Sequence, residues 1–125
     1  MVLTTREILC IVRKDAKLRK IFKGVYAIDQ LPRIILDKRP CALIVNLDPS
    51  WKPGSHWVAI FLEDKGGPAH YFDSFGRPPF DDAIISFLNR HSKQGWIYNG
   101  TRYQSISSTL CGIYCIAFLK SLARL

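Results

Sequence analysis

Cys111 and Gly112 stand where a polar stretch, SISST, gives way to an apolar run, CGIYCIAFL. This run predicts a buried helix that begins at or near Cys111. A thiol in the first turn of a helix is close to unpaired backbone N–H groups and to the positive end of the helix dipole, and both favour the nucleophilic thiolate. Gly112 would let a substrate approach the backbone, and the Cys111 N–H would be free to stabilise an oxyanion. The alternative is that Cys111 is a small buried hydrophobe, the commoner role of a free cysteine.

A base for such a thiol is present in a predicted β-hairpin, in which the β-rich runs HWVAIFL and AHYFDSF flank the loop EDKGGP. If Leu62 faces Gly67 across a four-residue loop, His56 falls opposite Asp73. Directly opposed residues point to the same face of a sheet. A carboxylate beside an imidazole fixes the tautomer of the ring and stabilises its cation, so the pair would suit general-base catalysis. The alternative is an ordinary ion pair on a solvated sheet face.

Gln104 precedes Cys111 by seven residues, across the polar loop SISSTL. If this loop folds back, the side-chain amide of Gln104 would supply a second oxyanion donor, although a loop glutamine is by default exposed to solvent. None of the neighbouring Ser and Thr residues lies in a G-x-S-x-G elbow, and the chain contains no G-x-x-x-x-G-K-[ST] loop. The sequence therefore does not indicate a serine hydrolase or a nucleotide hydrolase.

The length of the chain and the order of its expected helices and strands predict one α+β domain over residues 1–125, which must position these residues. The apolar run CALIVNL, residues 41–47, has the length of a buried central strand, and the hairpin follows it. The segment RPPFDDAIISFLNRHSKQG predicts a helix, and WIYNGTRYQ predicts an extended segment before the last helix. We expect helices on the flanks of a central, mostly antiparallel sheet of about four or five short strands.

Several segments together resemble one known family. GSHWVAIFL, HYFDSFGRPP, RYQSISST and CGIYCIAFL are similar to the corresponding segments of the adenovirus-type cysteine maturation proteases, including those encoded by Polinton-like elements. The order His, acid, Gln, Cys and the dipeptides His-Trp and Cys-Gly are those of the family. FKGVYAIDQLP and CALIVNLDPSWKPGSHW resemble the upstream part, so the likeness covers nearly the whole chain.

The resemblance implies a papain-like cysteine protease fold and active site. The nucleophile, base, orienting acid and oxyanion donor would be, in that order, Cys111, His56, Asp73 and Gln104. The residues implied near the substrate groove are Gly54 and Trp57. The resemblance further implies a monomeric endopeptidase that trims capsid and core proteins during particle maturation, in the virion or the host nucleus, and prefers small residues, often glycine, beside the cut bond.

Two departures from the adenovirus enzymes bear on function. Adenovirus enzymes have glutamate in place of Asp73, although related enzymes use aspartate, and they continue well past their Cys helix, whereas this chain ends at Leu125. A deconjugating protease of the SUMO-specific kind is an alternative, because it shares the order His, Asp, Gln, Cys-Gly. Such enzymes usually have aspartate immediately before Cys-Gly, where this chain has Leu110. A non-enzymatic, DNA-binding module is a third hypothesis.

The net charge of the chain indicates which partners it could bind. The formal net charge is +8 and the pI is about 9.6. The basic residues are concentrated in the first forty positions, where the candidate DNA contacts are Lys14, Lys17, Arg19, Lys20 and Lys23. Such a face attracts polyanions without reading their sequence, or it is simply a solvated surface.

Stimulation by DNA is expected from the resemblance. Lys93 stands where adenovirus enzymes have the cysteine that binds an activating peptide covalently, so a covalent activator is not expected. Four cysteines without a C-x-x-C pair are typical of free thiols in a reducing, intracellular compartment and do not indicate zinc or another cofactor. No apolar run reaches the ~18 residues of a membrane span.

Overall fold

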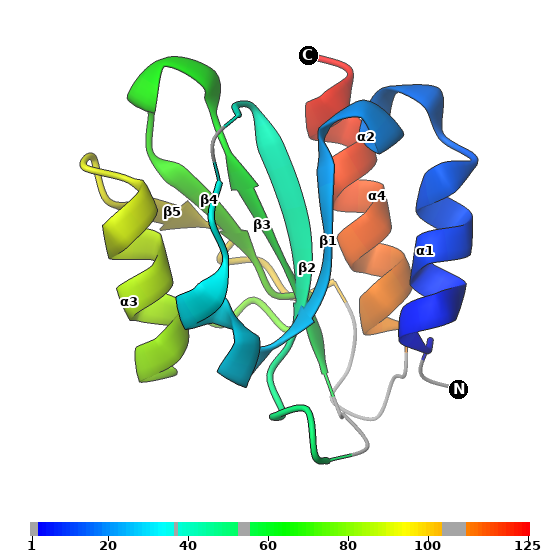
Figure 1. The fold of residues 1–125 in the computed structure, drawn as a ribbon, viewed down its shortest axis with the longest axis horizontal. Helices are drawn as coiled ribbons and strands as arrows, with labels where there is room; N and C mark the ends of the chain where they lie inside the picture. The colour runs from blue at the N-terminus through cyan, green and yellow to red at the C-terminus, as the bar shows by residue number, and fades with distance from the viewer. Residues whose placement is uncertain (1–2, 37, 53–55, 104–109) are drawn as a thin grey trace.

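The computed structural model describes residues 3–36, 38–52, 56–103 and 110–125. Its centre is one five-stranded sheet in the order β1-β2-β3-β4-β5 (Figure 1). The strands are β1 (Phe22–Ala27), β2 (Cys41–Asn46), β3 (Trp57–Leu62), β4 (Ala69–Phe72) and β5 (Trp96–Tyr98). One face of the sheet is covered by α1 (Thr5–Arg13), α2 (Ala16–Ile21) and α4 (Cys111–Ala123), and the other by α3 (Asp82–His91) and the 3-10 helix η1 (Ile28–Arg33).

The expected α+β architecture, with helices flanking a central sheet, is present, but the sheet is mixed rather than mostly antiparallel. The two inner pairs, β2–β3 and β3–β4, are antiparallel. The two outer pairs, β1–β2 and β4–β5, are parallel. A parallel pair requires a crossover connection, which α3 supplies between β4 and β5 and η1 helps to supply between β1 and β2.

Strand β2 shows why the sheet forms the middle layer. All six residues of β2 are buried, as the continuous apolar run predicts for a strand covered on both faces. Its side chains alternate, so that Ile44 packs toward α4 and Leu43 packs toward α3. Strand β3 is likewise buried along its whole length. It packs against α4, and the first residue of β3, Trp57, contacts the first residue of α4, Cys111.

The hairpin register predicted from the loop length is wrong by two residues. Leu62 pairs with Ala69 instead of Gly67, because a 3-10 turn, η2 (Asp64–Gly66), lengthens the loop. A shift of two residues keeps every side chain on its face of the sheet. His56 and Asp73 therefore still share a face, but they lie just beyond the ends of β3 and β4 and are not directly opposed.

The segment after β4 turns sharply at Gly76. The Gly76 N–H donates to the carbonyl of Asp73 at 2.7 Å, and the Tyr103 N–H donates to the carbonyl of Ser74 at 2.7 Å. Gly76 has φ of +77°, and a Cβ there would lie 2.8 Å from the backbone carbon of Thr101. Glycine is thus required both for the backbone conformation and for the close approach of the 101–103 segment.

We expect Gly76→Ala to destabilise the fold more than Gly95→Ala. Gly95 has nearly the same φ, +78°, but nothing lies within 4 Å of its added Cβ. Gly95→Ala should therefore cost only the left-handed conformation, about 1–2 kcal/mol. Gly76→Ala should add the clash with Thr101. Urea unfolding measures both, and equal free energies of unfolding would contradict the close contact.

Candidate active site

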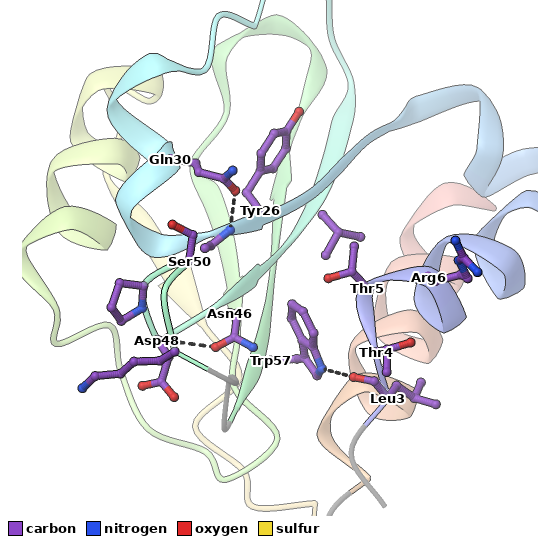
Figure 2. A pocket seen from close by; sticks show the side chains of 14 residues that line it. Leu3, Thr4, Thr5, Arg6, Tyr26, Gln30, Asn46, Asp48, Ser50 and Trp57 are labelled. Carbon is purple, nitrogen blue, oxygen red and sulfur yellow. Dashed lines mark hydrogen bonds between the residues drawn. The ribbon is translucent and has the colours of Figure 1, made fainter.

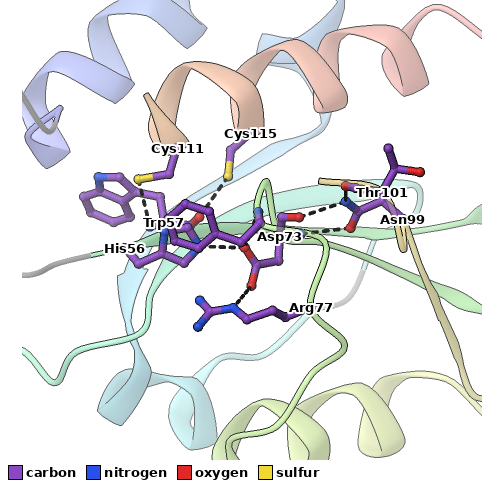
Figure 3. Close-up of polar contacts among 9 residues, drawn as sticks. His56, Trp57, Asp73, Arg77, Asn99, Thr101, Cys111 and Cys115 are labelled. Atoms are coloured by element: carbon purple, nitrogen blue, oxygen red, sulfur yellow. Dashed lines mark hydrogen bonds and ion pairs between the residues drawn. The ribbon is translucent and has the colours of Figure 1, made fainter. Parts of the chain in front are cut away.

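Cys111 is the first residue of α4, as the sequence predicts, and its sulfur lies against the first peptide of β3. The Trp57 N–H donates to Cys111 Sγ at 3.4 Å (Figure 3). Only 2% of Cys111 is exposed. The N–H of Cys111 belongs to the first turn of α4, which has no intrahelical acceptor for it. The sulfur therefore combines a helix N-terminus with a backbone donor from the neighbouring strand.

His56, the residue immediately before β3, joins the sulfur to a carboxylate. Its Nε2 lies 2.7 Å from Asp73 Oδ1, and the ring lies near enough to the Cys111 thiol for the two groups to shift each other's pKa. The ring of Phe75 stacks on the imidazole with centroids 4.4 Å apart and planes 6° apart. Because Nε2 faces the carboxylate, Nδ1 is the nitrogen available to exchange a proton with the sulfur.

Asp73, the residue immediately after β4, is completely buried. Its Oδ1 accepts from the Phe75 N–H at 2.9 Å as well as facing His56, and its Oδ2 accepts from Arg77 Nε at 3.0 Å. Burial raises the pKa of this carboxyl, but the hydrogen bonds from His56, Phe75 and Arg77 outweigh burial and hold the pKa below its ordinary value. Asp73 is therefore a carboxylate at neutral pH.

Asn99 fixes the backbone of Asp73, a role that sequence reasoning missed. Asn99 Oδ1 accepts from the Asp73 N–H at 3.1 Å, and Asn99 Nδ2 donates to the Asp73 carbonyl at 2.8 Å and to the Thr101 carbonyl at 2.8 Å. The sequence predicted only an extended segment, WIYNGTRYQ, around Asn99. No local signal could connect Asn99 to a residue 26 positions away.

The protonation equilibria of Cys111 and His56 are shifted toward an ion pair. Burial raises the pKa of the Cys111 thiol, but hydrogen bonds with His56 and the Trp57 N–H outweigh burial and bring the pKa below its ordinary value. Burial lowers the pKa of His56, but hydrogen bonds to Asp73 and Cys111 outweigh burial and raise it. A thiolate beside an imidazolium is the form that attacks carbonyl carbon.

The remaining predicted site residues are placed as follows. Gly112 is buried, and a Cβ there would lie 3.2 Å from both Leu3 and Trp57, so these side chains fill the space beside it. Trp57 is also buried, and its indole N–H donates to the Leu3 carbonyl at 2.9 Å. Gln104 and Gly54 lie outside the described residues.

A cavity of about 580 Å³ is lined in part by Trp57 (Figure 2). It is bounded by the start of α1, the end of β1 and the segment after β2, and its polar lining includes Thr5, Gln30, Asn46 and Ser50. Trp57 lines this cavity and its N–H also contacts Cys111 Sγ, whereas Cys111, His56 and Asp73 are not among the residues that line the cavity.

The five predicted DNA contacts are all exposed, and they lie on α2 or close to its ends. Helix α2 packs beside the C-terminal end of α4, where Arg124 forms an ion pair of 2.6 Å with Asp15, the N-cap of α2 (Figure 1). The basic cluster is thus at the opposite end of α4 from Cys111. Within the described ranges, no His, Cys, Asp and Glu side chains group as metal ligands, and no helix is long and apolar enough to cross a bilayer.

Sequence comparison finds relatives among viral proteases. The chain is 34% identical over 86 residues to a putative thiol protease of Acanthamoeba polyphaga mimivirus, covering 62% of this chain and 28% of that protein. It is 32% identical over 98 residues to a cysteine protease of African swine fever virus, and the match covers 67% of this chain and 35% of that protein. It is 24% identical over 134 residues to the protease of Porcine adenovirus A serotype 3, and the match covers 97% of this chain and 65% of that protein. No protein-family model matches the sequence.

Structure comparison confirms the fold. A crystal structure of the African swine fever virus protease matches with a TM-score of 0.72 at 22% identity, covering 98% of this chain and 57% of that one. Matching proteins from several isolates of the same virus are named SUMO-1 cysteine protease. This chain spans about a third or less of the length of its mimivirus and African swine fever virus relatives. It is therefore homologous to viral cysteine proteases of adenovirus-like type and has their fold.

We expect Cys111 to react with iodoacetamide faster than the other cysteines at about pH 6.5, because its pKa is lowered. Cys115 should react slowest, since burial raises its pKa well above the ordinary value. His56→Ala should raise the pKa of Cys111 and slow its labelling about tenfold or more at this pH. Peptide mapping by mass spectrometry measures the rates. Equal labelling of Cys111 with and without His56 would contradict the ion pair.

Proposed function

We propose that this chain is the catalytic core of a cysteine endopeptidase that uses Cys111, His56 and Asp73 as its catalytic residues. The observation that carries the proposal is the His56 imidazole, which lies 2.7 Å from the buried Asp73 carboxylate and near enough to the Cys111 thiol for each group to shift the pKa of the other. The relatives support the reaction class, because they include a thiol protease and cysteine proteases.

The geometry supports a two-step acyl transfer. The Cys111 thiolate attacks the scissile carbonyl carbon, and the N–H of Cys111 stabilises the oxyanion, with Gln104 as the expected second donor. The His56 imidazolium then gives its proton to the leaving amine, which leaves a thioester on Cys111. His56 next removes a proton from water, which attacks the thioester and releases the acid and the thiol. Asp73 keeps the ring oriented and stabilises its cation throughout.

We propose capsid and core precursors of a virus or virus-like element as substrates, cleaved during particle maturation in the virion or host nucleus. The viral origin of the relatives supports this class. The narrower assignment to the branch encoded by Polinton-like elements remains a prediction. The resemblance to the adenovirus-type proteases implies a preference for small residues near the cut bond.

Deconjugation of a SUMO-like modifier is a second candidate function. The observation that favours it is the name SUMO-1 cysteine protease carried by relatives that are 31% identical over 98 residues. The same Cys111 mechanism would cleave either substrate, so only the substrate distinguishes the two candidates.

Purified protein should cleave fluorogenic peptides with small residues at the cut site, and Cys111→Ala should lower kcat/KM at least ~10³-fold because it removes the nucleophile. Cys41→Ala is the matched control, since Cys41 is also buried but lies in β2 on the opposite face from α4. We expect Cys41→Ala to retain cleavage.

A SUMO conjugate is assayed in parallel. Cleavage of the conjugate alone would favour the second candidate, and hydrolysis that survives Cys111→Ala would overturn the thiol mechanism. Duplex DNA binding without hydrolysis of any substrate would instead favour the non-enzymatic module. Measuring mass in solution tests the expected monomer.

We also propose that duplex DNA stimulates cleavage by binding the exposed cluster Lys14, Lys17, Arg19, Lys20 and Lys23. Lys20→Gln should weaken DNA binding and reduce the dependence of log K on log salt by about one unit, because one phosphate contact is lost. Lys93→Gln is the control, since Lys93 is exposed beyond α3, away from the cluster. Fluorescence anisotropy over a salt series measures both, and equal slopes would contradict this DNA surface.

A further inference from the structure

Arg77 binds the oxygen of Asp73 that faces away from His56. Its Nε donates to Asp73 Oδ2 at 3.0 Å, whereas Oδ1 faces His56 Nε2 at 2.7 Å and accepts from the Phe75 N–H (Figure 3). Both oxygens of the Asp73 carboxylate therefore have a side-chain partner, His56 at Oδ1 and Arg77 at Oδ2. In the sequence Arg77 lies within HYFDSFGRPP, where no local pattern indicates a role for it.

Two aromatic rings hold the Arg77 guanidinium in place. Its central carbon lies 5.1 Å from the centroid of Phe75 and 5.3 Å from that of Phe80, both distances at which a cation is attracted to a ring face. Phe75 is also the ring that stacks on His56. The side chain of Arg77 is 45% exposed, so these contacts restrict a group that would otherwise move freely.

The groups around the Asp73 carboxylate explain why this carboxylate needs Arg77 as a fixed hydrogen-bond donor. His56 and Arg77 donate to it, and Tyr71 and Cys115 lie near enough to feel its charge. Burial raises the pKa of the Tyr71 hydroxyl and of the Cys115 thiol, so both are neutral at pH 7. A fully buried carboxylate with a missing partner would protonate or rotate toward another donor.

We propose that Arg77 is a positioning residue that fixes the Asp73 carboxylate and, through it, the orientation of the His56 imidazole toward Cys111. The inference rests on the proposed function for its biological meaning. It concerns the state of the Cys111 thiol, however, and that state is measurable without any peptide cleavage. Arg77 itself need not touch a substrate.

The test compares Cys111 alkylation by iodoacetamide as a function of pH in Arg77→Gln, Arg77→Lys and wild type. Arg77→Gln should slow labelling about five- to tenfold near pH 6, because a partly exposed charged hydrogen bond contributes modestly. Arg77→Lys should recover part of the rate, since it keeps the charge but loses the planar fork. With any peptide that is cleaved, kcat should fall more than KM rises.

Arg124→Gln is the matched control. Arg124 pairs with a buried aspartate, Asp15, at 2.6 Å and its side chain is 47% exposed, but it lies at the far end of α4 from Cys111. It should leave the alkylation profile of Cys111 unchanged. Circular dichroism establishes that each variant is folded, and if Arg77→Gln does not fold, Arg77→Lys carries the comparison.

A double-substitution cycle with Asp73→Asn tests whether Arg77 acts through Asp73. The effect of Arg77→Gln should disappear in the Asp73→Asn background, because the carboxylate it positions is absent. An undiminished effect in that background, or an Arg77→Gln profile identical to wild type, would overturn the inference. If alkylation responds as expected but no peptide is cleaved, the positioning role holds and the proposed endopeptidase function fails.

Discussion

The hydrogen bond between His56 and the buried Asp73 carboxylate is the contact on which the site depends. Each of these residues lies just outside a strand, His56 before β3 and Asp73 after β4. Their pairing therefore requires that the hairpin, the turn at Gly76 and the Asn99 segment all adopt their observed conformations. The carboxylate is fully buried, and an ionised group in that position is stable only while its donors are in place.

Helix α4 contacts strand β3 through the backbone N–H and C=O of one residue, Trp57. The Trp57 N–H donates to Cys111 Sγ at 3.4 Å, and the Cys115 thiol donates to the Trp57 carbonyl at 3.3 Å. Cys111 and Cys115 are one helical turn apart, so both contact the backbone of Trp57 from one face of α4. Cys115 is thus both a core residue and part of the support that aims a backbone N–H at the nucleophile.

The two ends of α4 differ in chemistry. Its N-terminal end carries Cys111 beside an imidazole and a polar cavity, and its C-terminal end lies beside the basic helix α2. A polyanion bound at α2 would leave the Cys111 end open to a peptide. Such a separation is what the proposed binding of duplex DNA at α2 requires of an active site at the other end of α4.

The sequence by itself determined the local features: the helix start at Cys111, the buried strand at β2, and a shared face for His56 and Asp73, because these depend on periodicity of 3.6 or 2 residues. It did not determine the parallel outer strands or the hairpin register, and the roles of Asn99 and Arg77 were missed. Asn99 contacts a residue 26 positions away, and a six-residue loop replaced the expected four. Asn99 meets Asp73 through packing that no local pattern encodes. Arg77 and the hairpin loop are close in the chain to their partners, but their geometry depends on the turn at Gly76 and on η2, which only the tertiary structure shows.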